Sequence, residues 1–330
     1  MLRLHEIIKI VTDLQERGEL ELAQRIAGHY MVILDSMELR FIHLGITAKL
    51  GYVDQVMDLL EASLETNHWF STWFLQRDPE LRQLGDLPRF QRILKACDEK
   101  ETQYWQSGAM TPILQVPPSV QPPYSLLIAI HGNGFNAQHS ASQWAGAEEA
   151  GWMVFHPLAK RLVGYGLHWW DTHEENREII ADQAGKIIKQ YPIDFDRMIL
   201  GGFSKGGETA MVLALLGQFG AKGFITIGAG GYYHIQPELW QPLLESPPHS
   251  LRGVAMYSPY DLERVEGLNH TLDMLQTAGI EVRMEKYSAE GHVFPEDFDV
   301  RYQSAVEFVM RASPSEVTKT TTLTQPFGLD

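Results

Sequence analysis

The stretch from residue 197 to 216, RMILGGFSKGGETAMVLALL, constrains the fold of this chain more than any other. Its apolar run at 198–200 predicts a strand buried on both faces, and the residues after Ser204 have the spacing and composition of a helix. Between the two, G-x-S-x-G places Ser204 on a sharp turn, where any Cβ at Gly202 or Gly206 would collide with the neighbouring strand and helix. The turn lifts the hydroxyl to a helix N-terminus, which favours developing negative charge. The stretch therefore predicts a nucleophilic serine; the alternative is an ordinary strand-to-helix turn that carries a serine.

Composition limits the kind of molecule this can be. With 330 residues, of which 44% are hydrophobic, the chain is long enough for two domains with a substantial core. A net charge of −15, from 27 basic and 42 acidic side chains, argues against nucleic acid or an anionic membrane as the main partner. The single cysteine, Cys97, excludes an internal disulfide framework and a multi-cysteine metal site. The charged N-terminus and the lack of a long apolar run predict a soluble, cytoplasmic protein without a membrane span.

The first 105 residues have the pattern of helices only. Apolar residues at helical spacing predict helices at 4–14, 20–34, 37–50 and 53–64. Gly18 and Gly51 lie 33 positions apart with similar sequence after each, and a glycine turn recurring about every 34 residues resembles tetratricopeptide repeats. The stretch from Asp78 to Phe90 resembles the piece that often closes such arrays. This segment could bind a protein or peptide partner, or it could cover one side of the second domain or form a homodimer.

Strands and helices alternate after a proline-rich stretch at 112–123. Apolar runs predict strands at 125–130, 153–155, 198–200, 224–227, 254–257 and 282–287, with an edge strand near 113–116. Helices are expected at 140–150, 174–190, 262–278 and 300–310. This alternation predicts an α/β fold with a doubly wound, mostly parallel sheet covered on both faces. We therefore expect a helical domain at 1–105, an α/β domain at 106–312 and a disordered tail at 313–330.

A glycine-flanked loop follows the first buried strand of the α/β part and reads His131-Gly132-Asn133-Gly134. In an open α/β sheet, the loops at the carboxyl ends of the strands form the site. Such a loop brings a backbone N–H close to a substrate carbonyl, and Asn133 is the natural donor by position. With the N–H of Lys205, the residue after the serine, it would complete a two-donor oxyanion hole. A glycine turn without chemistry is the alternative.

A base and an acid are expected later in the chain. His292 lies between the last predicted strand and the last predicted helix, from where it can reach Ser204. The predicted acid is Asp261, at the start of the helix expected at 262–278, and Glu263 is the rival candidate. Asp261 could also be a helix N-cap without a catalytic task. The order Ser204, Asp261, His292 is the one used on the α/β-hydrolase fold. In that arrangement the serine attacks, the histidine takes and returns the proton, and the aspartate holds the imidazole.

Four stretches carry a more specific resemblance: IAIHGNG, FHPLAKRLVGYGLHWWD, ILGGFSKGGETAMVLAL and AGIEVRMEKYSAEGH. They resemble the phospholipase/carboxylesterase branch of the α/β-hydrolases, which includes acyl-protein thioesterase-like and dienelactone-hydrolase-like esterases. The resemblance implies that the first stretch supplies the oxyanion loop, the third the nucleophile and the last the histidine. It also implies that Trp169, Trp170 and Asp171 lie in a loop bordering the acyl site. The chain has YSPYDLERV where the family usually has H-G-x-x-D-x-x-V, and this departure concerns the acid.

The substrate is expected to contact the loops at the strand ends. The residues predicted to bind it are His131, Gly132, Gly134, Trp169, Trp170 and Tyr232. Lys205 could meet an anionic substrate at the mouth of the site, or it could be a solvated side chain. His168 and His173 suggest a metal by composition, but the resemblance and the absence of an H-E-x-x-H spacing favour an aromatic pocket wall. No metal and no cofactor are expected.

These predictions combine into a serine hydrolase that cleaves a carboxylic ester or thioester of a small molecule through an acyl-enzyme. A serine peptidase on the same fold is one alternative, although such enzymes usually carry a large accessory domain and the helical part here is small. A protein that works through its helical repeats, with the α/β part as a scaffold, is the other. The sequence leaves the acyl chain and the leaving group open.

Overall fold

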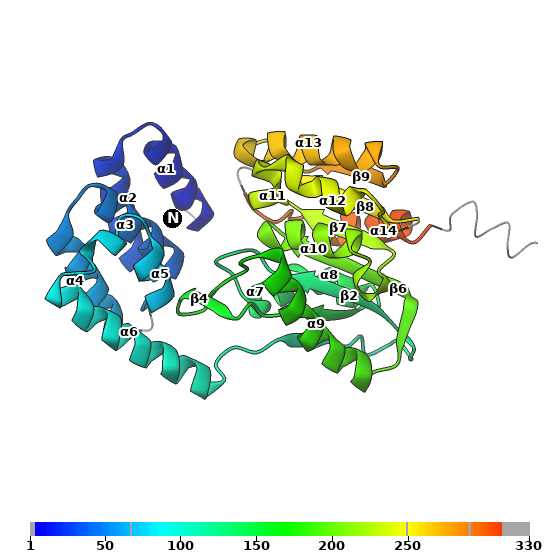
Figure 1. The fold of residues 1–330 in the computed structure, drawn as a ribbon, viewed down its shortest axis with the longest axis horizontal. Helices are drawn as coiled ribbons and strands as arrows, with labels where there is room; N and C mark the ends of the chain where they lie inside the picture. Colours follow the sequence, from blue (N-terminus) through cyan, green and yellow to red (C-terminus); the bar gives the residue numbers. More distant parts are fainter. Residues whose placement is uncertain (1–3, 67, 249, 290–291, 312–330) are drawn as a thin grey trace, which may run out of the picture. The chain divides into compact units, whose positions relative to one another are not determined.

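The computed structural model of the chain describes residues 4–66, 68–248, 250–289 and 292–311, and Figure 1 traces its elements along the sequence. The chain divides into two compact units. The first comprises Met1–Pro112, Gly132–Ala137 and Leu158–Ile179. The second comprises Ile113–His131, Gln138–Pro157 and Ile180–Asp330. The boundary near residue 105 stays a prediction, and the predicted tail at 313–330 lies outside the described residues.

The N-terminal segment is all helical, as its apolar periodicity predicts. Its helices are α1 (Leu4–Glu16), α2 (Leu20–Ile33), α3 (Met37–Lys49), α4 (Val53–Leu64), α5 (Thr72–Arg77), the short η1 (Arg82–Leu84) and α6 (Pro88–Ser107). The first four agree with the predicted ranges to within about two residues. Gly18 and Gly51 have φ of 75° and 74°, a left-handed conformation that lets the chain turn between successive helices.

The first unit also contains a short antiparallel hairpin far along the chain from these helices. It consists of β4 (Arg161–Gly164) and β5 (Leu167–Trp169). No strand is predicted at these positions, because the segment is short and carries no clear alternation. Val163 and Leu167 of the hairpin are buried in the same apolar cluster as residues of α3, α4 and α6. The hairpin therefore belongs to the hydrophobic core of the helical segment.

The second unit is built on a seven-stranded sheet with the order β1-β3-β2-β6-β7-β8-β9. Its strands are β1 (Ile113–Gln115), β2 (Tyr124–Ile130), β3 (Met153–His156), β6 (Ile193–Phe203), β7 (Gly223–Ile227), β8 (Arg252–Tyr257) and β9 (Glu281–Lys286). The edge strand β1 runs antiparallel to β3, and every other neighbouring pair is parallel. The predicted doubly wound, mostly parallel α/β fold is confirmed.

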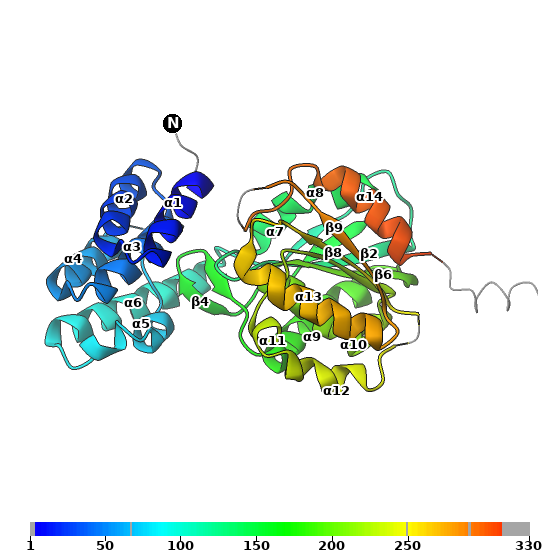
Figure 2. The ribbon, with the colours of Figure 1, turned by 90° about the horizontal axis from the view of Figure 1, so that it is seen from above.

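Helices cover both faces of this sheet, as Figure 2 shows. On one face lie α8 (Ala145–Glu149) and α14 (Phe298–Val309); on the other lie α10 (Lys205–Leu215) and α13 (Leu262–Thr277). One long helix was predicted at 140–150, but the structure has two, α7 (Ala137–Gln143) and α8. The break falls at Trp144, which has φ −101° and ψ 15° and packs its buried ring 4.9 Å from that of Phe298. Seating this large ring against α14 interrupts the helix.

The strand order places the nucleophile stretch at the centre of the sheet. From β2 the sheet continues to β3 on one side, and from β6 it continues to β7 on the other. The order therefore reverses between β2 and β6, and ligands of open α/β sheets bind at the carboxyl ends of strands at such a point. In the described residues, no helix has both the length and the apolar character that a membrane crossing requires.

Because two histidines are fully buried, we expect the unfolding free energy of the protein to fall in mild acid. Burial lowers the pKa of His156 to about 3 and that of His168 to about 4, because desolvation penalises the charged ring. Below pH 6.5 the two histidines are protonated in the unfolded chain but stay neutral in the folded chain. The unfolding free energy therefore falls as the pH is lowered from 6.5 towards the two lowered pKa values. Each ring is expected to remove about 2 kcal/mol of unfolding free energy between pH 7 and pH 5. Urea unfolding at several pH values measures the fall, which should be shallower for His156→Gln; equal slopes for both proteins would contradict the assignment.

Candidate active site

Ser204 sits on a strained turn between β6 and α10. Its φ of 56° and ψ of −125° are sparsely populated by residues other than glycine, and such strain persists only where the surroundings fix it. The surroundings here are backbone hydrogen bonds. The N–H of Ser204 donates to Ile227 O at 3.0 Å, and its carbonyl accepts from Glu208 N at 3.1 Å and from Gly230 N at 3.3 Å. The turn is therefore held from α10 on one side and from the end of β7 on the other.

The glycines on either side of the serine are required by close backbone approach. A Cβ at Gly202 would lie 2.3 Å from the carbonyl carbon and oxygen of Gly206. A Cβ at Gly206 would lie 2.2 Å from Ile130 O and 2.4 Å from His131 O, both at the end of the adjacent strand β2. Backbone atoms cannot move aside as a flexible side chain would. These distances confirm the steric reason for the G-x-S-x-G pattern.

His292 and Asp261 form a close pair at the carboxyl ends of β9 and β8. His292 Nδ1 lies 2.6 Å from Asp261 Oδ2, and the side chains are 22% and 8% exposed. A neutral imidazole that donates from Nδ1 to a carboxylate has Nε2 as its basic atom. The pairing thus fixes the tautomer in which the ring can take a proton from a hydroxyl group.

The imidazole of His292 lies beside the serine turn. It stacks on Phe203, the residue before Ser204, with ring centroids 4.7 Å apart and planes inclined by 23°. A Cβ at Gly228, which follows β7, would come within 3.0 Å of His292 Cε1. The ring is therefore wedged between the last residue of β6 and the loop after β7, directly next to the candidate nucleophile.

Two hydrogen bonds hold the loop that carries His292. Ser258 Oγ, in the loop of the acid, donates to Ala289 O, and Tyr287 Oη donates to Val293 O at 2.8 Å. These contacts fasten the loop on both sides of His292. Sequence reasoning did not identify Ser258 or Tyr287, because neither belongs to a recognisable motif.

Asp261 occupies the N-cap position of α13 but does not act as a cap. Among the described residues its side chain makes no capping hydrogen bond, and one carboxylate oxygen faces His292. The alternative of a simple N-cap is thus not favoured by the geometry. The rival acid, Glu263, has a side chain outside the described part of the structure.

The geometry predicts a clear ranking of acid variants. Asp261→Asn is expected to lower kcat by about 10⁴-fold, because the amide favours the wrong imidazole tautomer and removes the charge that stabilises the cation. Glu263→Gln should change kcat by less than about threefold. Steady-state kinetics on the two purified variants checks this. The reverse ranking would assign the acid to Glu263.

The side chain of Lys205 is buried rather than solvated. Its side chain is 11% exposed, and its ammonium lies 2.6 Å from Oε1 of the fully buried Glu208. The same carboxylate accepts from the backbone N–H of His234 at 3.2 Å and lies 2.8 Å from His234 Nδ1. Of the two alternatives for Lys205, the solvated side chain is wrong, because the ammonium pairs with Glu208, three residues along α10. Contact with an anionic substrate stays a prediction. The Lys–x–x–Glu spacing was the available signal.

The glycine-flanked loop after β2 belongs to the first unit from Gly132 onwards. Asn133 is held by its side chain: Oδ1 accepts from Trp170 N at 2.7 Å, and Nδ2 donates to Trp170 O at 3.3 Å. Gly134 has a φ of 79°, which glycine adopts without strain. His131, the first residue of the loop, is 1% exposed and belongs to the second unit.

The predicted substrate-binding aromatic residues differ in exposure. Trp170 is buried, whereas Trp169 is half-buried and packs against the apolar cluster of the helical segment. Tyr232 begins the short helix α11 (Tyr232–Ile235) and is exposed. His168 Nδ1 lies 2.7 Å from Ala159 O, and its Nε2 lies 2.8 Å from the hydroxyl of Tyr104. Both of its ring nitrogens are engaged by protein groups, which fits a structural ring rather than a metal ligand.

The structure therefore brings part of the predicted site together. Ser204, Lys205, Asp261 and His292 gather at the carboxyl edge of the sheet in the second unit. The residues of the first unit that were predicted for the site are Gly132, Asn133, Gly134, Trp169 and Trp170. Pairing of Asn133 with Lys205 in an oxyanion hole stays a prediction.

Comparison with known proteins bears on the fold. An uncharacterized protein from Bacillus cereus ATCC 10987 has a TM-score of 0.52 at 17% identity, over 93% of this chain and 99% of that one. Esterase PE8 has a TM-score of 0.49 at 16% identity, over 59% of this chain and 99% of that one. An S-formylglutathione hydrolase from Agrobacterium tumefaciens has a TM-score of 0.49 at 16% identity, over 61% of this chain and 90% of that one. No family model matches the chain, nor does any curated protein sequence.

At these identities the similarity concerns the fold alone. The first of these matches extends over 93% of the chain, and so over most of the helical segment as well as the sheet. The strand order and the strand–turn–helix at Ser204 are those expected of the α/β-hydrolase fold. The chain has the α/β-hydrolase fold, preceded by an all-helical N-terminal segment.

Proposed function

We propose that this chain is a serine hydrolase that cleaves a carboxylic ester or thioester through an acyl-enzyme. The observation that carries the proposal is the pair Asp261–His292, with Nδ1 and Oδ2 2.6 Å apart, stacked beside the strained turn of Ser204. A carboxylate-oriented imidazole next to a serine on such a turn is the arrangement that activates a hydroxyl nucleophile. Residues 106–312 would form the catalytic domain.

In the first half of the reaction, Ser204 Oγ attacks the carbonyl carbon of the substrate as His292 Nε2 takes the hydroxyl proton. Asp261 stabilises the imidazolium that forms. The negative charge on the substrate oxygen is stabilised by backbone N–H donors, for which Lys205 and Asn133 are the candidates. The N–H of Lys205 lies at the N-terminus of α10, where the helix dipole favours negative charge. Collapse of the intermediate expels the alcohol or thiol, which takes the proton from His292.

In the second half, water attacks the acyl-enzyme. His292 Nε2 takes a proton from the water, the acyl–oxygen bond to Ser204 breaks, and the proton returns to the serine. The products are a carboxylic acid and a regenerated enzyme, so atoms and charge balance without a cofactor. Next to the nucleophile, the ammonium of Lys205 is paired with the buried carboxylate of Glu208.

A substrate panel tests the class of bond. We expect p-nitrophenyl esters of acetate, butyrate and octanoate and the corresponding acyl-CoA thioesters to be hydrolysed, and peptide p-nitroanilides to react at least about 10³-fold more slowly. The matched control is Ser204→Ala, which removes only the hydroxyl. Faster cleavage of the anilides would identify a peptidase. Equal rates for the wild type and the control on every compound would contradict a hydrolase and favour a protein that works through its helices.

A further inference from the structure

A short ladder of backbone segments connects the N-terminal helices to the loop of Asn133. Phe70, just before α5, pairs with Gly164 of β4; β4 pairs with β5; and His168 of β5 pairs with Phe135. All of these residues belong to the first unit. We call this arrangement, residues 69–71, β4, β5 and 134–135, the hairpin ladder. It joins chain segments that lie far apart in sequence, with the candidate oxyanion loop at one edge.

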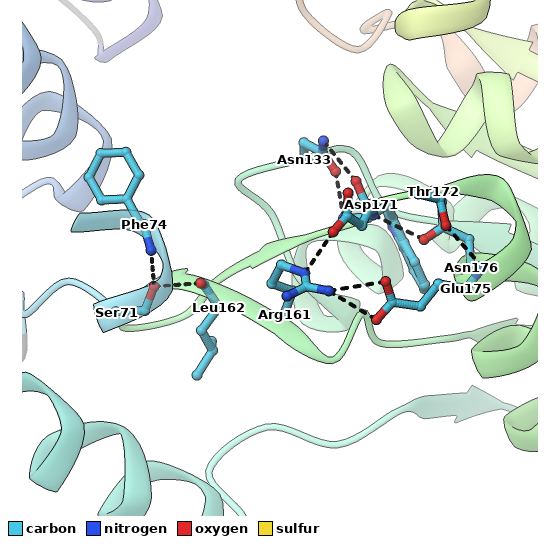
Figure 3. A network of polar contacts seen from close by, with 10 residues as sticks. Ser71, Phe74, Asn133, Arg161, Leu162, Asp171, Thr172, Glu175 and Asn176 are labelled. Atoms are coloured by element: carbon cyan, nitrogen blue, oxygen red, sulfur yellow. Dashed lines mark hydrogen bonds and ion pairs between the residues drawn. The ribbon is translucent and has the colours of Figure 1, made fainter. Parts of the chain in front are cut away.

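The helical segment holds the β4 side of the ladder through Ser71 and Trp69. Ser71 N donates to Val163 O at 2.8 Å, and its hydroxyl donates to Leu162 O at 2.6 Å, as Figure 3 shows for the hydroxyl. Tyr165 N donates to Trp69 O at 2.9 Å. Ser71 is fully buried, and its hydroxyl also accepts from the first turn of α5. These bonds are shielded from water, so replacing them with bonds to solvent requires opening the structure.

The backbone at this edge approaches too closely for any residue but glycine. A Cβ at Gly164 would lie 2.5 Å from Met37 Cε and 2.8 Å from Trp69 O. The neighbouring Arg161 places its guanidinium 4.9 Å from the ring centroid of Trp73 in α5. It also forms ion pairs with Asp171 and Glu175, as Figure 3 shows. The hairpin is thus packed directly on the helices, without room for an intervening layer.

Helix α6 holds the β5 side of the ladder through Tyr104. Its hydroxyl lies 2.8 Å from His168 Nε2, and His168 Nδ1 lies 2.7 Å from Ala159 O. Because Ala159 O can only accept, the neutral ring donates from Nδ1, so Nε2 accepts the proton of the tyrosine hydroxyl. Both side chains are buried, with exposures of 4% and 0%. The hydroxyl of Tyr104 and the carbonyl of Ala159 together fix the orientation of the ring at the middle of β5.

The far edge of the ladder carries the loop of Asn133. Gly134 N donates to His168 O at 2.9 Å, and His168 N donates to Phe135 O at 3.1 Å. Trp170, which directly follows β5, makes the two hydrogen bonds to the Asn133 side chain described above. Asn136 Nδ2 donates to Gly166 O at 2.9 Å, at the turn of the hairpin. Every polar contact named here ties this loop to the hairpin, which is in turn tied to the helices.

We infer that the N-terminal helical segment positions the oxyanion loop, and that Tyr104 is the positioning residue through which α6 acts. The inference rests on the proposed function, in which Asn133 supplies a donor to the oxyanion. An oxyanion hole acts through donors that are held in place before the reaction, so small displacements reduce its effect in the transition state more than in substrate binding. The helices would then contribute to kcat without touching substrate.

Tyr104→Phe in the full-length protein tests this, with Tyr52→Phe as the matched control. The second variant removes an exposed hydroxyl of the same helical segment, which lies 3.4 Å from Glu21 and away from the hairpin ladder. For Tyr104→Phe we expect kcat for a p-nitrophenyl ester to fall about tenfold with KM changed less than twofold. Hydrogen exchange at the amides of Gly134 and His168 should accelerate about tenfold, with no change in β6 or α10. The control should behave as the wild type in both measurements.

Each outcome decides the inference. Unchanged exchange at Gly134 and His168 would overturn it whatever the activity. Faster exchange with unchanged kcat would also overturn it, because the helices would then hold a loop that catalysis does not need. An inactive wild type would refute the proposed function itself, and the inference with it. Where Tyr104→Phe fails to fold, Arg161→Gln replaces it; this side chain is 27% exposed, and its loss should produce smaller changes in the same directions.

Discussion

Replacing Ser204 by alanine is expected to lower kcat for ester hydrolysis by about 10⁵-fold while leaving the fold intact. The loss is large because, in the proposed mechanism, Ser204 Oγ forms the covalent bond to the acyl group. Donors to the oxyanion and substrate binding would leave only a residual rate above that of water. Alanine keeps the Cβ and the backbone hydrogen bonds of the turn, so circular dichroism and the melting temperature should stay close to those of the wild type.

Ser142→Ala is the matched control for this variant. Ser142 is an exposed serine of α7, and its replacement should leave kcat within about twofold of the wild type. Activity of Ser204→Ala at a tenth of the wild-type value or more, in protein shown to be free of contaminating esterases, would exclude Ser204 as the nucleophile.

Gly206→Ala is expected to have the largest effect on stability, lowering the unfolding free energy by at least about 3 kcal/mol or preventing folding. The added Cβ would lie 2.2 Å from Ile130 O and 2.4 Å from His131 O, two carbonyls at the end of β2. Relieving this clash requires moving α10 away from the sheet, because the main-chain carbonyls of a central strand cannot rotate away from the added Cβ. Urea unfolding of the purified variant measures the loss.

Gly185→Ala, the same substitution at another glycine, is expected to stabilise the protein rather than destabilise it. Gly185 lies inside α9 (His173–Gln190), and a Cβ there would meet nothing within 4 Å. Alanine has the higher helix propensity, so this variant should gain about 0.5–1 kcal/mol of unfolding free energy. If both variants were equally stable, the close approach of α10 to β2 would be wrong, and with it the steric basis of the serine turn.

Local patterns in the sequence were sufficient to predict most of the fold. The apolar run before Ser204 and the helical spacing after it predicted β6 and α10, and the glycine pattern predicted their close approach. Each of these features depends on residues within a few positions of one another. The same holds for the helices α1 to α4, whose periodicity is local and whose turns are marked by glycine.

The features that escaped prediction depend on distant partners. The hairpin β4–β5 is short and is completed by Phe70 and Phe135, which lie far from it in sequence, so nothing local distinguishes it from a loop. The burial of Lys205 depends on Glu208 turning inward, which a helical spacing permits but does not require. Sequence reasoning likewise left the acid open between Asp261 and Glu263. The 2.6 Å contact with His292 favours Asp261, and it involves a residue 31 positions away.

Labelling with a fluorophosphonate probe tests the central claim, an activated Ser204, most directly. The account predicts stoichiometric modification of the wild type, mapped by mass spectrometry of peptides to Ser204. It also predicts that the rate falls by about 10³-fold or more in His292→Ala, because the hydroxyl then lacks its base. Modification of another residue, or equal labelling rates for the wild type and His292→Ala, would contradict the account.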